Sequence, residues 1–105
     1  MTISGPALLA QIGAGGAPVI LDVRSAQEFQ RGHVPGALHV PFTAVGERLA
    51  DIPGSPREPV VVYCQYGPRA WIAGRTLRRN GFTRVIYLKG HFHRWQKAGL
   101  RVETR

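Results

Sequence analysis

Short apolar runs that alternate with helical segments constrain the fold of this chain more than any other feature. The run Val60–Tyr63 is apolar throughout, as expected of a strand that is covered on both faces of a sheet. Val19–Val23, Val85–Leu88 and the brief segment Ala37–Val40 are further strand candidates. Strands separated by helices normally pair in parallel, so we expect an α/β fold with a mostly parallel sheet and helices on both faces.

The segments between these runs carry helix signals. Ser4 is suited to cap a first helix, which ends in the glycines that follow Ile12. We find no internal repeat and no linker, so residues 1–105 are expected to form a single domain. Further helices are predicted at Ala26–Arg31, Thr43–Leu49, Ala70–Asn80 and Phe92–Ala98, and a Pro/Gly-rich loop at Pro53–Pro59.

The composition narrows the classes of partner and location. No apolar run is long enough to cross a membrane, and the N-terminus lacks the features of a secretory signal. One cysteine allows no internal disulfide, so we expect a cytoplasmic protein. Fourteen Lys and Arg against six Asp and Glu give a net charge of +8. These basic residues are scattered, which disfavours nucleic-acid binding and favours a solvated face that attracts small anions or an acidic partner.

The single cysteine, Cys64, stands directly after the strand Val60–Tyr63 and shortly before a helix. Ligands of parallel sheets bind beyond the carboxyl ends of the strands. A loop at this position can direct its N–H groups and the helix dipole at one point, which favours thiolate over thiol. A lone cysteine is often a buried core residue, but this position predicts a nucleophile.

The residues after Cys64 form a candidate substrate-binding loop. Gly67 gives the conformational freedom of a tight turn, and Pro68 fixes the entry into the helix. Arg69 supplies a permanent cation that can bind an oxyanion or brace the loop. Beyond the loop, Trp71 is either part of an aromatic pocket rim or a packing residue. The complete loop is Gln65, Tyr66, Gly67, Pro68 and Arg69, with Tyr66 as a second candidate for the rim.

Three sets of residues occur in an order and spacing typical of one family. The first is Leu21–Arg24, Glu28–Phe29 and Gly32–Ala37 with Val40–Pro41; the second is Tyr63–Arg69; the third is Gly81–Phe82, Val85, Leu88, Gly90, Trp95 and Ala98–Leu100. They resemble the single-domain rhodaneses, sulfurtransferases that carry sulfur as a cysteine persulfide. The resemblance covers nearly the whole chain and implies a rhodanese-like sheet of five parallel strands flanked by helices.

The resemblance implies a two-step reaction without a metal or organic cofactor. Cys64 would take sulfur from a small anionic donor, either thiosulfate or a persulfide or polysulfide. An external thiol, on a small molecule or a protein, or cyanide in an assay, would then remove it from the persulfide. The loop N–H groups would stabilise the persulfide anion. Because the chain has no second cysteine, the acceptor must come from outside.

Asp22 and Arg24 are expected to brace the loops at the carboxyl edge of the sheet by hydrogen bonds. Their loss would impair activity through position or through stability, and the sequence leaves both open. Donor choice is also open, because Gln65, Tyr66 and Pro68 stand where many relatives have small or basic residues.

His91 is a further departure, since it stands where the family usually has the second glycine of a pair. We expect either a rearranged loop or His91 held at positive φ, with its imidazole near the pocket mouth and His93 in the first turn of the next helix. Either ring could add positive charge or pass a proton, or both could simply face solvent. A metal site is disfavoured because no carboxylate or cysteine lies near the pair in sequence. His33 and His39 are expected to be hydrogen-bonded scaffold residues.

Two other functions remain as alternatives. Phosphatases and arsenate reductases of related fold place one more residue between the cysteine and the arginine, whereas four intervene here, residues 65–68. The smaller loop suits a single sulfur atom better than a phosphate. In the other alternative the domain is a binding or sulfur-relay module for one partner protein. Such rhodanese-like modules often lack the cysteine that this chain keeps.

Overall fold

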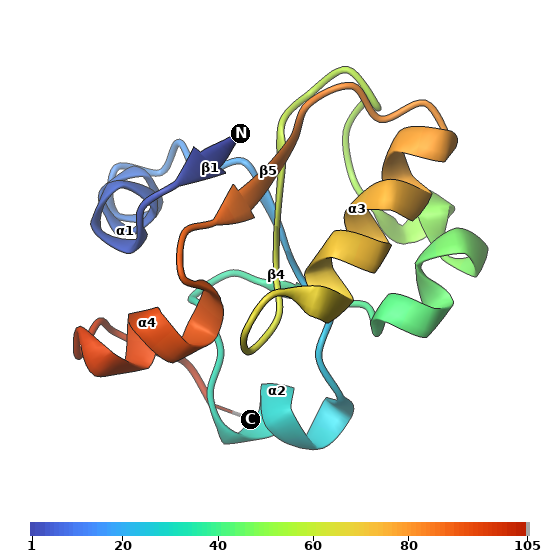
Figure 1. Cartoon of the computed structure of the whole chain (residues 1–105). Helices are drawn as coiled ribbons and strands as arrows, with labels where there is room; N and C mark the ends of the chain where they lie inside the picture. Colours follow the sequence, from blue (N-terminus) through green and yellow to red (C-terminus); the bar gives the residue numbers. More distant parts are fainter. Residues whose placement is uncertain (105) are drawn as a thin grey trace.

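Five parallel strands form the centre of the computed structural model, which describes residues 1–104 (Figure 1). The order across the sheet is β1-β5-β4-β2-β3, with every pair parallel. The two edge strands have two residues each, which leaves little unpaired edge. The strands are β1 (Thr2–Ile3), β2 (Val19–Asp22), β3 (Leu38–His39), β4 (Val60–Tyr63) and β5 (Val85–Leu88).

The predicted strands at residues 60–63 and 85–88 are confirmed with the same bounds. Strand β1 was not predicted, because two residues carry no recognisable pattern. It exists through pairing with β5, in which Thr2 lies opposite Tyr87 and Ile3 opposite Leu88. The parallel α/β fold that the sequence predicts is therefore correct, with one strand added at the edge.

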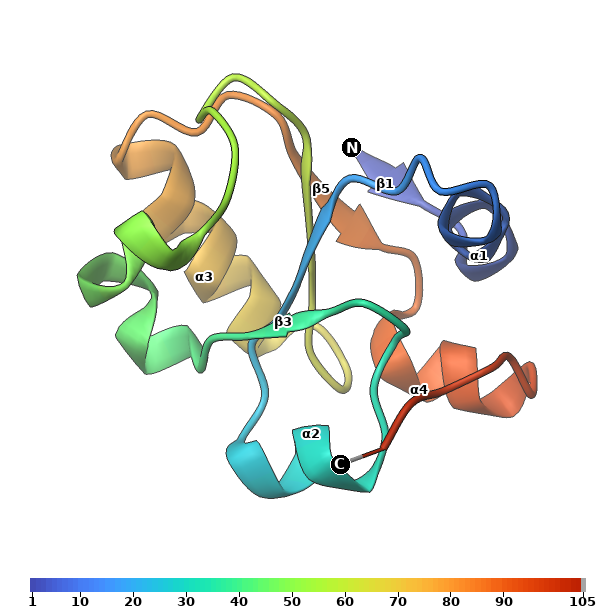
Figure 2. The ribbon, with the colours of Figure 1, turned by 180° about the vertical axis from the view of Figure 1, so that it is seen from behind.

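Helices cover both faces of the sheet, as expected (Figures 1 and 2). The side chains of Val60 and Val62 pack with α3, while Val61 and Tyr63 pack on the opposite face with α1 and α4. This alternation explains why β4 is apolar throughout. No helix among residues 1–104 has the length and hydropathy that a membrane crossing requires. The α-helices are α1 (Gly5–Gly13), α2 (Ala26–Arg31), α3 (Pro68–Arg79) and α4 (His91–Lys97).

Side-chain caps fix where the first two helices begin. The Ala7 N–H donates to Ser4 Oγ at 3.2 Å, so Ser4 caps α1 as predicted. In α2 the Glu28 N–H donates to Ser25 Oγ, and the Ser25 N–H donates to Glu28 Oε1, which completes a capping box. The same Glu28 side chain reaches the candidate site described below.

The α-helix predicted at Thr43–Leu49 is wrong. The chain forms two 3₁₀ helices instead, η1 (Phe42–Glu47) and η2 (Leu49–Asp51). Gly46 and β-branched residues lower the helix propensity of this short segment, and Arg48 leaves helical geometry between the two pieces. The segment is held by packing against α3, with Val45 fully buried.

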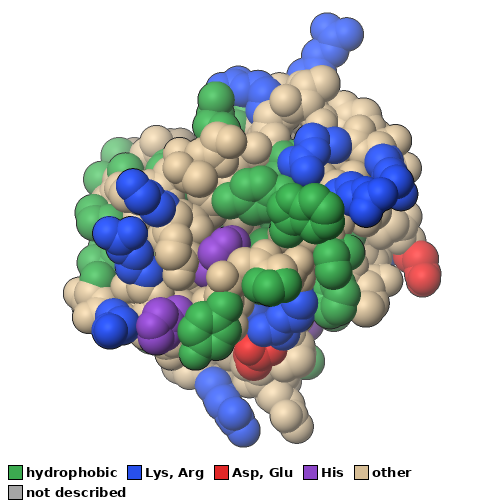
Figure 3. Space-filling view, viewed as in Figure 1, with side chains coloured by type: hydrophobic (Ala, Val, Ile, Leu, Met, Phe, Trp, Pro, Cys, Tyr) green, Lys and Arg blue, Asp and Glu red, His purple; other side chains and the backbone are tan. Residues whose placement is uncertain are grey.

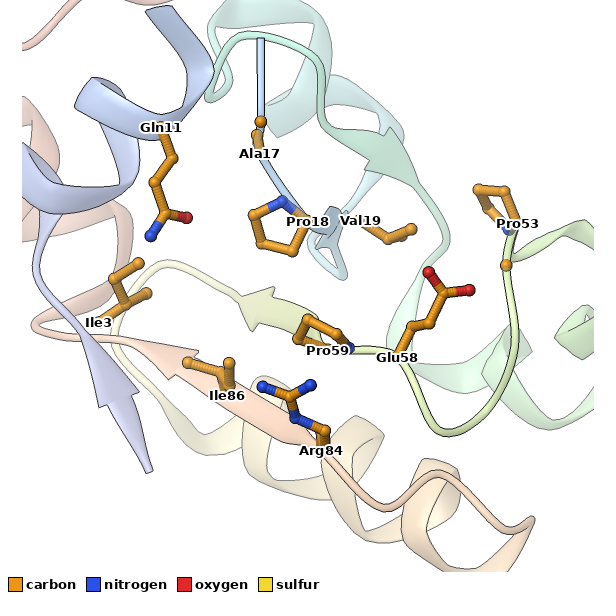
Figure 4. Close-up of a pocket in the computed structure, with 12 residues that line it drawn as sticks. Ile3, Gln11, Ala17, Pro18, Val19, Pro53, Glu58, Pro59, Arg84 and Ile86 are labelled. Atoms are coloured by element: carbon orange, nitrogen blue, oxygen red, sulfur yellow. The ribbon is translucent and has the colours of Figure 1, made fainter. Parts of the chain in front are cut away.

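A wide hollow of about 560 Å³ opens at the amino ends of the strands (Figure 4). It lies at the end of the sheet opposite Cys64, because Val19, Pro59 and Arg84 mark the starts of β2, β4 and β5. Three prolines and several aliphatic side chains line it, and no cysteine or histidine is among its residues. The candidate nucleophile therefore lies at the other end of the sheet from this hollow.

Candidate active site

Cys64 follows β4 directly and is 1% exposed. Its Sγ accepts the Gly67 N–H at 3.0 Å, so a backbone donor of the loop points at the sulfur as the sequence predicted. Gly67 has φ of 134°, a conformation that residues with a side chain rarely adopt. Pro68 then starts α3, two residues earlier than predicted. The turn from strand to helix is tight enough to place the sulfur beneath the loop.

Helix α4 holds the loop from the other side. The Phe92 N–H donates to the Cys64 carbonyl at 3.0 Å and the His93 N–H to the Gln65 carbonyl at 3.1 Å. These are N–H groups of the first helical turn, which have no partner within their own helix. In addition, Gln65 Nε2 donates to Gln96 Oε1 at 2.9 Å. The loop is thus bound to a segment about 28 positions later in the chain, which no local pattern indicates.

His91 has φ of 54° and is the one non-glycine residue with positive φ among residues 1–104. Of the alternatives open for His91, the structure shows the ring held at positive φ beside the Cys64 loop, and it contradicts a ring that simply faces solvent. The Cys64 N–H donates to His91 Nδ1 at 3.3 Å, which requires the neutral ring with its proton on Nε2. Burial lowers the pKa of His91 and favours that neutral form. A Cβ at position 67 would lie 3.3 Å from His91 Nε2, so Gly67 also makes room for the ring.

His93 lies in the first turn of α4, as predicted, and its ring faces Tyr66 with 5.0 Å between centroids. Both side chains are exposed. Trp71 is 56% exposed, so the alternative that it is a packing residue is wrong. These aromatic rings lie on the surface around the loop, and they do not enclose the sulfur.

Asp22 and Arg24 form a buried network below the loop. Arg24 Nη2 donates to Asp22 Oδ2 and to the Gly32 carbonyl, both at 2.7 Å, while Arg24 Nη1 lies 3.4 Å from Gln65 Oε1. The Tyr63 hydroxyl donates to Asp22 Oδ2 at 2.6 Å and accepts the Val34 N–H. Burial and the nearby carboxylate raise the pKa of Tyr63, so its hydroxyl keeps the proton that it donates.

Arg69 makes a bidentate pair with Glu28, at 2.6 and 3.0 Å. The hydrogen bonds from Arg69 lower the pKa of Glu28 to about 2. Of the two roles open from the sequence, bracing the loop is the one that the geometry shows. Glu28 was not among the predicted site residues. The Ser25–Glu28 spacing indicates a capping box, but nothing in the sequence links Glu28 to Arg69.

The histidines expected to belong to the scaffold do so. His33 Nδ1 lies 2.7 Å from the Phe29 carbonyl, and its ring stacks on that of Phe29. His39 Nε2 lies 2.8 Å from the Arg24 carbonyl. His33 therefore supports the backbone of α2, and His39 supports that of Arg24.

Two hollows flank the Cys64 loop, and Cys64 lines neither of them. One, of about 230 Å³, is lined by charged and amide side chains that include Arg24, Glu28 and Gln65. The other, of about 310 Å³, is lined by His91, Arg94 and apolar residues. On this face of the molecule, hydrophobic side chains and histidines gather beside Lys and Arg (Figure 3).

Residues 5–98 match the family model of the rhodanese-like domain. The chain belongs to the rhodanese family. This rhodanese domain is 32% identical over 84 residues to a sulfurtransferase of Allochromatium vinosum, covering 80% of this chain and 77% of that protein. The human single-domain sulfurtransferase TSTD1 superposes with a TM-score of 0.80 at 26% identity, covering 91% of this chain and 95% of that one.

A third relative, uncharacterized protein YqhL of Bacillus subtilis, is 40% identical over 76 residues, which is 72% of this chain. The rhodanese domain spans only 59% of the length of that protein. Membership of the family supports sulfur transfer as the general chemistry.

Proposed function

We propose that this rhodanese domain transfers sulfane sulfur from an anionic donor to a thiol through a persulfide on Cys64. The observation that carries the proposal is the position of the Cys64 Sγ, at the carboxyl end of β4 with the Gly67 N–H 3.0 Å away. A backbone donor at this distance stabilises negative charge on sulfur, both on the thiolate and on a persulfide formed there. Among the relatives are proteins named thiosulfate sulfurtransferase, which supports thiosulfate as the first donor to test.

In the first step the Cys64 thiolate attacks the outer sulfur of thiosulfate. The Sγ–S bond forms as the S–S bond of thiosulfate breaks, and the electron pair of that bond leaves with sulfite. In the second step an acceptor thiolate attacks the outer sulfur of the persulfide. The Sγ–S bond breaks, its electron pair returns to Cys64, and the acceptor leaves as a persulfide. No net oxidation or reduction takes place, and no cofactor takes part.

His91, Asp22 and Arg24 are positioning residues in this proposal. His91 holds the Cys64 N–H, and the Asp22–Arg24 pair approaches Gln65 from below, so all three act on the loop and not on the donor. Arg69 is occupied by Glu28, which leaves it less able to wrap a tetrahedral oxyanion. This pairing, with only four residues between Cys64 and Arg69, disfavours a phosphatase or arsenate reductase.

The proposal is tested by intact-protein mass spectrometry after incubation with thiosulfate and, separately, with a polysulfide. Wild type should gain one sulfur atom and lose it on addition of a thiol, whereas Cys64→Ala should gain none. The matched control is Arg84→Ala, which alters the far end of the sheet and should load like wild type. No added sulfur with either donor would overturn the transferase and favour the binding module.

A further inference from the structure

Three large apolar side chains lie exposed around the Cys64 loop, where a protein surface normally carries polar groups. Tyr66 in the loop is 69% exposed, and Trp71 and Ile72 near the start of α3 are 56% and 44% exposed. The opposite side of α3 is the one that packs on the sheet, through Ala70, Ala73, Gly74 and Leu77. Trp71 and Ile72 are not among the residues of the core, and their exposed surface is available to a partner.

Positive charge borders this apolar surface. The guanidinium of Arg75 lies over the Trp71 ring, 5.8 Å from its centroid. In the described part of the chain, three salt bridges form, and Arg75 takes part in none of them. Lys and Arg side chains border hydrophobic ones on this face in Figure 3. An acidic partner complements this arrangement, whereas a second copy of a chain of charge +8 is repelled.

The depth of the sulfur specifies the shape of that partner. Cys64 is 1% exposed, and a persulfide extends the side chain by one S–S bond of about 2 Å. The outer sulfur thus reaches only the mouth of the loop. A flat protein surface cannot bring a thiol to it, but a terminus or a narrow loop can.

We propose that Tyr66, Trp71 and Ile72, together with Arg75, form a docking surface for an acidic protein that presents its acceptor thiol on a protruding segment. This inference rests on the proposed sulfur transfer, because it names the acceptor of the same site. The aromatic and aliphatic side chains anchor the segment, and Arg75 orients it so that its cysteine meets the persulfide.

The test uses a synthetic Glu-rich peptide that ends in Leu-Cys, and a second peptide in which every Glu is Lys. Wild-type protein is first loaded with polysulfide, and transfer to each peptide is followed by mass spectrometry. The acidic peptide should accept sulfur about tenfold faster than the basic one at low salt, with the difference shrinking as salt is added. 2-Mercaptoethanol serves as a small neutral acceptor for comparison.

The variants Ile72→Ser and Arg75→Glu should each lower transfer to the acidic peptide about five- to tenfold while leaving transfer to 2-mercaptoethanol unchanged. Arg84→Glu carries the same charge change at the far end of the sheet and is the matched control. If both peptides accept sulfur equally, or if Arg84→Glu has the same effect as Arg75→Glu, the docking surface is wrong while sulfur transfer stands.

Binding is measured separately with the acidic peptide in which Ser replaces Cys. Trp71 is exposed and Trp95 is buried, so a change in tryptophan fluorescence reports on the proposed surface. A change that saturates with peptide and is weakened in Ile72→Ser supports docking even if no persulfide forms. The absence of any change at low salt overturns it, whatever the chemistry of Cys64.

Discussion

The amino ends of the strands surround a hollow of about 560 Å³, whereas the carboxyl ends surround the single cysteine and hollows of about 230 and 310 Å³. At the amino end, Arg84 has no ion pair among residues 1–104, and the Glu58 carboxylate accepts a hydrogen bond from the nearby Ser55 N–H. At the carboxyl end, Asp22, Arg24 and Tyr63 bond one another in the core. The charged side chains that line the larger hollow are thus held by fewer hydrogen bonds and ion pairs to one another than those at the carboxyl end.

This difference shows that volume is a poor guide to chemistry in a parallel sheet. What distinguishes the carboxyl end is that β4 and β5 both end there, so the Cys64 loop and the start of α4 meet side by side. Side chains held by several bonds can be placed precisely enough to act on a sulfur atom. Paired substitutions, one at each end of the sheet, and conditions that affect only one end distinguish the two regions experimentally.

The largest difference in stability is expected when the removal of a carboxylate at the carboxyl end is compared with the removal of one at the amino end. Asp22→Ala leaves the Arg24 guanidinium buried without its ion pair and the Tyr63 hydroxyl without its acceptor. We expect the free energy of unfolding to fall by about 3–5 kcal/mol, measured by urea titration. Glu58→Ala, at the exposed amino end, should lower it by no more than about 1 kcal/mol. Equal losses for the two variants would remove the contrast.

A smaller effect, dependent on pH, is expected from Glu28→Gln. The hydrogen bonds from Arg69 lower the pKa of Glu28 to about 2, below the ordinary value of 4.5. A carboxyl with a lowered folded pKa stabilises the protein above about 4.5, and this stabilisation is lost as the pH falls toward 2. Because Glu28 is 29% exposed, solvent screening limits the contribution to about 1–2 kcal/mol.

The measurement is the unfolding free energy of wild type and Glu28→Gln across this range. The two curves should be separated at pH 7 and converge in acid. A constant separation from pH 7 down to about 2 would mean that the ion pair is not responsible.

Protonation of His91 is expected to lower the rate of persulfide formation about fivefold. This residue has no counterpart at the amino end. Protonation of the ring places a hydrogen on Nδ1 and removes the acceptor of the Cys64 N–H. Because burial lowers the pKa of His91, the neutral form persists to lower pH than for an ordinary histidine. The rate of persulfide formation should therefore fall only below about 6.5.

His91→Gly should lack this acid fall, and its profile is compared directly with that of wild type. His93→Ala is the matched control, because the His93 ring contacts Tyr66 and not the Cys64 backbone. Profiles of wild type and His91→Gly that coincide from neutral to acid pH would contradict a positioning role for His91.

The smallest effect concerns the field of the whole molecule. If the net charge of +8 draws thiosulfate toward the loop, kcat/KM should fall about two- to threefold between low and high salt, with kcat changing less. The salt dependence should weaken in Arg75→Glu more than in Arg84→Glu, which lies at the other end. Equal salt dependence of kcat and kcat/KM would assign the basic residues to solvation alone.

The sequence predicted most accurately the elements whose burial follows from the pattern of their own residues. Val60–Tyr63 is apolar on both faces, so the pattern and length of this run were sufficient to predict a buried strand. The pair Thr2–Ile3 and the 3₁₀ segment after Pro41 were missed or misassigned, because pairing with β5 and packing against α3 decide their structure.

The same distinction applies to the site. Cys64 and Gly67 were predicted from a strand followed by a turn. Positive φ at His91 was one of two alternatives, the other being a rearranged loop, and both followed from the glycine that usually stands there. Glu28 was missed, because its partner Arg69 is 41 residues away and only the folded chain brings the two together. The exposure of the loop residues was the hardest property to predict, since it depends on which neighbouring segments of the folded chain cover them.

Because of the hydrogen bonds from α4 to the Cys64 loop, two amides of this helix report on how firmly the loop is held. The Phe92 and His93 amides can exchange their protons with solvent only when their bonds to the Cys64 and Gln65 carbonyls open. Deuterium uptake at these two positions therefore measures how often the loop loosens. A loop that must yield to admit a donor would expose both amides together, and a rigid loop would protect both.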